Sequence, residues 1–129
     1  RSSLFAKEGL IVLEAKLQLQ KGNRSEIEAY MKDLAARRRE KQPLEYPSAG
    51  STFKRPEGFF AGKLIMDAGL RGYSVGDACV SEKHCGFVIN KGTATAEDVC
   101  TLMKNVSAKI KDTFGVTLEP EVRIIGREL

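Results

Sequence analysis

A short proline-bounded stretch, residues 47–56, holds the residue types that could receive an anionic substrate. Gly50 has no side chain directly before Ser51, so another molecule could approach the backbone there. Lys54 and Arg55 follow the serine hydroxyl within four residues. The alternative is a turn that enters a strand and ends in two solvated cations, and composition alone favours this alternative.

A second candidate lies near the end of the sequence, where Glu119 and Glu121 flank a proline and Arg123 follows. These charges predict either a structural ion pair, which is the commoner arrangement, or an acid group held at the end of a sheet. His84 is the sole histidine, so we expect no metal site. No GxGxxG, P-loop or HExxH motif occurs, and the spacing of Ser51 and His84 does not indicate a Ser-His-Asp triad.

The composition limits the class of protein. A chain of 129 residues with 42% hydrophobic and 29% charged residues is typical of one globular domain. Part of the net charge of +4 sits in residues 37–41, which are either the solvated end of a helix, the favoured interpretation, or a site for an anion. No aromatic–basic stripe indicates nucleic acid, and no apolar run is long enough for a membrane helix. The three cysteines lack a Cys-x-x-Cys spacing and predict free thiols in a reducing compartment.

Periodicity predicts the elements that would position these groups. Alternating apolar residues favour a strand over Glu8–Gln20. Helical spacing and capping patterns, including Ser25 with Glu28 and Thr95 with Asp98, favour three helices. The helices are expected over residues 25–42, 58–68 and 95–114, and further strands over residues 51–53, 78–81, 86–90 and 121–125, with 70–75 irregular. We place a boundary near Gly22 and expect an α+β fold, a two-layer mixed sheet with helices on one face.

Four segments resemble one enzyme family in the family's order. The first contains Gly50-Ser51-Thr52-Phe53-Lys54, which is similar to the Gly-Ser-x-Phe-Lys segment of UDP-N-acetylenolpyruvoylglucosamine reductases, the MurB flavoenzymes. The other three are Ala61–Ile65, Ser81–Asn90 and Leu118–Gly126. The resemblance covers only the family's C-terminal part. It also points to the shorter subclass, because the chain has no room for the longer subclass's tyrosine-bearing insertion.

The resemblance implies a division of the chain and a set of cofactors. Residues 1–22 would be the C-terminal tail of the FAD-binding domain, and residues 23–129 the substrate-binding C-terminal domain. In the family, NADPH reduces FAD, and the flavin then reduces UDP-N-acetylglucosamine enolpyruvate to UDP-N-acetylmuramate, a peptidoglycan precursor needed for cell-wall biogenesis, cell shape and cell division. The sequence begins without Met, so we expect a fragment. Because the resemblance covers only the family's C-terminal part, it implies that most of the flavin-binding region is missing and that the fragment alone is inactive.

The family's catalytic residues carry over to three positions. Ser51, which follows the motif glycine, would protonate the substrate carbon, with Ser48 as the weaker candidate. Glu121 and Arg1 would stabilise the enolate-like intermediate. An unperturbed serine is a poor acid, so its proton must be positioned by neighbours.

The family's substrate-binding positions carry over in the same way. Lys41 and Arg55 would bind the diphosphate. Lys54 would support Ser51. His84 would lie on the substrate side or be a strand-end histidine without a ligand role, with neither favoured.

The resemblance also implies a setting and leaves a second function open. We expect a cytoplasmic monomer that binds a UDP-sugar and neither nucleic acid nor membrane. The alternative is a stand-alone sugar-nucleotide-binding module that uses the same basic cleft without redox chemistry. An upstream flavin-binding region in the same gene would favour the reductase.

Overall fold

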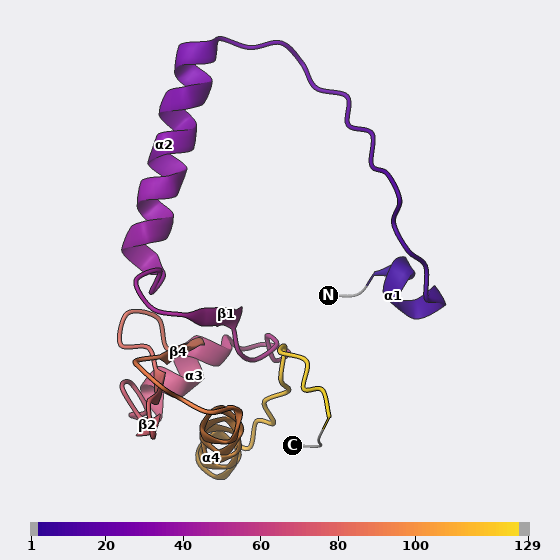
Figure 1. The fold of residues 1–129 in the computed structure, drawn as a ribbon. Helices are drawn as coiled ribbons and strands as arrows, with labels where there is room; N and C mark the ends of the chain where they lie inside the picture. The colour runs from indigo at the N-terminus through magenta and orange to yellow at the C-terminus, as the bar shows by residue number, and fades with distance from the viewer. Residues whose placement is uncertain (1–2, 127–129) are drawn as a thin grey trace. The chain divides into compact units, whose positions relative to one another are not determined.

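The structure is a computed structural model that describes residues 3–126. Contacts divide the chain into two units, Arg1–Asp33 and Leu34–Leu129. Figure 1 labels the helices and strands in chain order. They are α1 (Leu4–Glu8), α2 (Arg24–Lys41), β1 (Ser48–Ser51), α3 (Ala61–Asp67), β2 (Ser74–Val75), β3 (Ala78–Val80), β4 (Phe87–Asn90) and α4 (Ala96–Phe114).

The first unit contains helix α1, an irregular segment and the beginning of α2. Helix α1 ends at Gly9, whose φ of 64° is the left-handed conformation that glycine adopts most easily. Residues 10–23 form neither helix nor strand, so the predicted strand over Glu8–Gln20 is wrong. The apolar side chains of the segment are exposed, for example Ile11 at 84% and Leu13 at 93%. Alternation alone did not make a strand here because no other strand among residues 3–126 pairs with it.

Helix α2 confirms the predicted helix but begins differently. The Asn23 Oδ1 atom accepts hydrogen bonds from the Ser25 backbone N–H (3.0 Å) and hydroxyl (2.7 Å). Asn23 therefore caps the helix. The expected capping box of Ser25 with Glu28 is wrong, since Glu28 pairs with Arg24 at 2.7 Å. The last turn is basic, as predicted, and no residue of α2 is buried.

The four strands form one sheet in the order β1-β4-β3-β2. The α+β class is confirmed. All the described strand pairs are antiparallel, which corrects the expected mixed sheet. Short connections between β2, β3 and β4 permit only antiparallel neighbours. The predicted strand over residues 121–125 does not form, and Pro120 makes only an isolated antiparallel bridge with Phe53. Strand β2 was not predicted.

Helix α4 matches its prediction at both ends. The Thr95 hydroxyl accepts from the Asp98 backbone N–H (3.1 Å), while the Asp98 carboxylate accepts from the Thr95 N–H (2.8 Å). This capping box starts the helix, and Gly115 ends it with a φ of 69°. None of the helices in residues 3–126 is long and apolar enough to cross a membrane.

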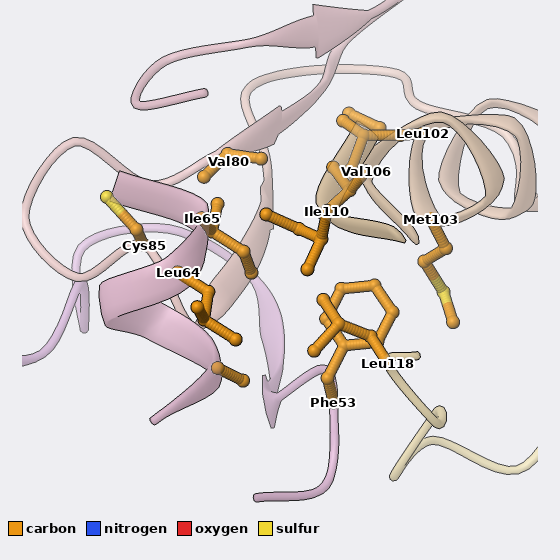
Figure 2. Packing of buried hydrophobic residues seen from close by; sticks show 12 residues of the cluster. Phe53, Leu64, Ile65, Val80, Cys85, Leu102, Met103, Val106, Ile110 and Leu118 are labelled. Carbon is orange, nitrogen blue, oxygen red and sulfur yellow. The ribbon is translucent and has the colours of Figure 1, made fainter. Parts of the chain in front are cut away.

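The core of the second unit lies between the sheet and the helices α3 and α4. Figure 2 shows Leu64 and Ile65 of α3 pointing into the volume that Ile110 of α4 enters, beside Phe53 and Leu118. Ile110 is fully buried and Ile65 is 1% exposed. Because this core includes both Phe53 and Leu118, it fixes the two segments that carry the sequence candidates.

Candidate functional site

The Ser51 segment and the Glu121 segment are joined through their backbones. The Lys54 N–H donates to the Glu119 carbonyl and the Glu121 N–H donates to the Thr52 carbonyl, each at 2.8 Å. Thr52 is buried, and its hydroxyl accepts from the Val88 N–H at 3.0 Å. Residues distant in sequence are therefore held beside Ser51 by tertiary hydrogen bonds.

A cavity of about 390 Å³, here called the Ser51 cavity, opens next to this junction. Its lining includes Ser51, Phe53, Arg55, Phe60, Lys63 and His84. The volume lies within the range of small-molecule sites. Most of its surface is apolar, and the polar side chains that line it are a hydroxyl, two cations and an imidazole, which suits a ligand with an anionic part.

Two glycines allow α3 to approach the loop before β4 at this cavity. A Cβ atom on Gly62 would lie 3.1 Å from the Gly86 backbone nitrogen. A Cβ atom on Gly86 would lie 2.9 Å from the His84 ring. The close approach explains why the sequence has glycine at both positions.

Arg55 is held on two sides. Its guanidinium carbon lies 3.9 Å from the centroid of the Phe60 ring, and its Nε donates to the Phe59 carbonyl at 3.2 Å. Arg55 lines the Ser51 cavity and also a second cavity of about 360 Å³ on its other side. It is therefore placed where two hollows of the surface meet.

His84 contributes an oriented imidazole to the Ser51 cavity. Its Nδ1 accepts from the Gly86 N–H at 3.1 Å, and its ring packs edge-on against Phe87 with the centroids 4.9 Å apart. Its own backbone N–H donates to the Ser81 hydroxyl at 3.3 Å. The Nδ1 atom is thus occupied as an acceptor, and Nε2 is the ring nitrogen that can meet a ligand.

The other sequence candidates lie elsewhere. Lys54 pairs with Glu119 at 3.0 Å and lines the second cavity, not the Ser51 cavity. Lys41 ends α2 and is exposed, and it is not among the residues that line the Ser51 cavity. Glu121 is exposed, and its backbone joins it to the residue after Ser51. Arg1 lies outside the described residues.

The weaker serine candidate has a local role. The Ser48 hydroxyl accepts from the Gly50 N–H at 3.1 Å within β1, where the pairing with β4 shifts in register between Ser48 and Ser51. Ser48 lines a different cavity, of about 240 Å³. The geometry favours Ser51, whose side chain lies at the Ser51 cavity and is exposed.

Sequence reasoning missed Phe60 and Lys63 as residues of this cavity. Phe60 lies five residues after Arg55 in the sequence, and two adjacent aromatic residues in a helix-entry loop are a weak signal for a cavity wall. Lys63 pairs with Asp67 at 2.8 Å.

Cys85 follows His84 in the sequence but is buried. Burial raises the pKa of the Cys85 thiol, so this thiol stays protonated near neutral pH.

Together the fold and the Ser51 cavity define an α+β domain with a surface cavity that a serine, a histidine and two cations line. The sequence model described as UDP-N-acetylenolpyruvoylglucosamine reductase, C-terminal domain, matches residues 42–125, more than half of the chain. The chain therefore belongs to this family, and the resemblance drawn from the four segments is confirmed.

Individual proteins that are similar to this chain carry the name of the same family. A UDP-N-acetylenolpyruvoylglucosamine reductase from Agathobacter rectalis is 66% identical over 126 residues, which are 98% of this chain and 40% of the relative. The enzyme of the same name from Lachnoclostridium phytofermentans is 64% identical over 129 residues, 42% of its length. The crystal structure of UDP-N-acetylenolpyruvylglucosamine reductase (MurB) from Thermus caldophilus superposes with a TM-score of 0.67 at 35% identity, covering 84% of this chain and 38% of that one. The chain thus spans about two fifths of the length of these relatives.

Proposed function

We propose that this chain is the substrate-side part of a flavoenzyme that reduces UDP-N-acetylglucosamine enolpyruvate to UDP-N-acetylmuramate. The observation that carries the proposal is the Ser51 cavity, where an exposed hydroxyl, the Arg55 guanidinium and the His84 imidazole meet. The relatives that the chain matches over nearly its whole length are named as reductases of this substrate. Their greater length supports a further part that holds the flavin.

The residues of this chain would handle the substrate and a proton. FAD, reduced by NADPH, supplies the hydride when bound. Ser51 would donate a proton to the carbon beside the one that receives the hydride. Glu121, held next to that segment by the hydrogen bond to Thr52, would stabilise the negative charge that develops, provided that it is protonated or orients a donor. Arg1 would share this role with Glu121.

Lys54 would support Ser51 indirectly. Its ammonium group pairs with Glu119, so it can fix the backbone next to Ser51 more readily than it can meet the substrate. The two side chains are well exposed, and an ion pair of this kind contributes about 0–1 kcal/mol to stability. The backbone hydrogen bonds of the junction therefore do most of the positioning.

The diphosphate of the substrate needs cations. Arg55 fits this role because a guanidinium binds phosphate oxygens in a bidentate manner. Lys41 would add a second charge at the end of α2. His84 would offer Nε2 to the sugar or to the diphosphate. The apolar lining of the cavity, including Phe53, would exclude water from the bound ligand.

Residues 1–22 would be the tail of the FAD-binding domain and residues 23–129 the substrate-binding domain. The exposed apolar side chains of the first segment support this assignment, because Leu13, Leu17 and Leu19 are each at least 80% exposed and need a partner. The sequence has no GxGxxG motif, and two cations are among the residues that line the Ser51 cavity, which fits a substrate subsite better than a complete flavin site. The isolated chain would be inactive, monomeric and, in the cell, cytoplasmic.

Titration of the isotope-labelled chain with UDP and with UDP-N-acetylglucosamine, followed by amide NMR spectra, tests this proposal. The amides of Ser51, Arg55 and His84 should shift selectively, with weak affinity that falls as salt is added. The matched variant Ser48→Ala should bind as the unaltered chain does, because Ser48 is not at the Ser51 cavity. Shifts confined to other surfaces, or none at high ligand concentration, would contradict the site.

A further inference from the structure

Among the cations of the Ser51 cavity, Arg55 differs from Lys63. Lys63 is neutralised by Asp67 at 2.8 Å. No carboxylate in residues 3–126 pairs with Arg55. The contacts of its head group are the Phe60 ring and the Phe59 carbonyl, and neither of them cancels its charge. Arg55 is therefore a cation that lines the cavity without a carboxylate partner among residues 3–126.

The two contacts occupy a particular part of the guanidinium. The Phe60 ring covers one face of the plane, and the Phe59 carbonyl uses the Nε–H group. The two terminal amino groups remain for a ligand. An unrestrained arginine at an exposed position would lose rotamer freedom on binding, whereas one that is already stacked loses less.

Phe60 is well placed to perform this holding role and is not explained by packing. It is 60% exposed and is absent from the hydrophobic core cluster. An aromatic face within about 6 Å of a cation attracts it by the ring quadrupole, with an effect of about two- to fivefold on an equilibrium at exposed sites. The Phe60 ring thus stabilises the position of the Arg55 guanidinium.

We propose that Phe60 is a positioning residue that holds the Arg55 guanidinium with its two terminal amino groups ready for the phosphate oxygens of the nucleotide. This inference rests on the proposed function and assigns to Phe60 a share of the selectivity for a diphosphate. Phe60 contacts Arg55, which would bind the phosphate oxygens, and is not itself a catalytic residue.

Two variants and a remote control test this role in the 129-residue chain, with UDP and uridine as the probes. Phe60→Leu should weaken UDP binding by about two- to fivefold and leave the weaker uridine binding unchanged, because uridine has no phosphate. Phe60→Tyr keeps an aromatic face and should bind UDP as the unaltered chain does. Phe114→Leu, a partly exposed phenylalanine at the end of α4, should have no effect.

A double-mutant cycle separates positioning from general damage to the cavity. If Phe60 acts through Arg55, Phe60→Leu should have no further effect on UDP binding in the Arg55→Gln background. Additive losses, equal losses of UDP and uridine binding, or unchanged UDP binding in Phe60→Leu would each overturn the inference.

The Arg55 Nε–H resonance gives a reading without any ligand. Stacking on Phe60 should shift this proton upfield by the ring current, and Phe60→Leu should remove the shift. An unshifted resonance in the unaltered chain would overturn the positioning role alone. A shifted resonance without selective UDP binding would overturn the proposed function and the ligand part of the inference, while the stacking itself would stand.

Discussion

Residues 10–23 and residues 74–90 carry similar sequence patterns but have different structures. Both contain short runs of apolar residues, and the first alternates more regularly than the second. Only the second forms strands, because β2, β3 and β4 pair with each other and cover a core. In the first, Leu13 and Leu19 are exposed. The comparison shows that a strand forms only with a neighbouring strand. Alternation predicts which face of a segment could be buried, but the segment becomes a strand only if it pairs with another segment.

The largest difference between the two regions should appear in amide hydrogen exchange. No backbone hydrogen bond joins residues 11–22 to another part of residues 3–126, so their amides should exchange at rates close to those of an unfolded chain. The amides of Val80 and Ile89 in the centre of the sheet should open only with free energies close to that of global unfolding, about 5–15 kcal/mol for a domain. Protection of residues 11–22 in the monomer would break the comparison.

The next difference should appear in matched truncations. Ile110→Ala removes a fully buried side chain and should lower the free energy of unfolding by about 2–5 kcal/mol in urea denaturation. Leu13→Ala removes a side chain that is 93% exposed and should change it by less than about 0.5 kcal/mol.

The same leucine sharpens the assignment of residues 1–22. In a longer protein that carries the proposed flavin-binding part, Leu13 should be covered, and Leu13→Ala should then destabilise that protein by an amount typical of a core leucine. A neutral effect in both proteins would contradict the assignment of this segment to the flavin domain.

The smallest expected effect concerns pH. Burial raises the pKa of the Cys85 thiol above its ordinary value of 9.0, so the unfolded chain releases this proton first as the pH rises. The protonated thiol contributes its full stabilisation at pH values below the pKa of the unfolded chain, and this contribution is lost as the pH rises through the pKa of the folded chain. Urea denaturation between pH 7 and 10 should therefore show a steeper loss of stability for the unaltered chain than for Cys85→Ala. Parallel curves would contradict the burial of the thiol.

The sequence could predict elements whose signals are local. Helix α4 was predicted at both ends because the Thr95 and Asp98 side chains and the flexibility of Gly115 act within a few residues. The strand order, the antiparallel pairing and the isolated bridge between Phe53 and Pro120 could not be predicted, because they depend on which segments meet.

For the candidate site too, local signals could be predicted from the sequence, and contacts between distant segments could not. Local motifs and the resemblance predict Ser51, Arg55 and His84 as site residues, and these three residues line one cavity. The pairing of Lys54 with Glu119, which takes Lys54 out of that cavity, joins residues far apart in the sequence. The stacking of Arg55 on Phe60 needs a loop conformation that no short motif specifies.

The central claim is that Ser51 protonates a substrate after a flavin has delivered hydride, and stopped-flow absorbance of the longer flavoprotein tests it most directly. In Ser51→Ala, NADPH should bleach the flavin at a nearly unchanged rate, while reoxidation by the enolpyruvyl substrate should slow by about 10²–10⁴-fold, the usual effect of one positioned acid. Glu121→Gln should slow the same step, and Ser48→Ala should slow neither. Normal reoxidation in Ser51→Ala, or equal slowing of both half-reactions, would contradict the account.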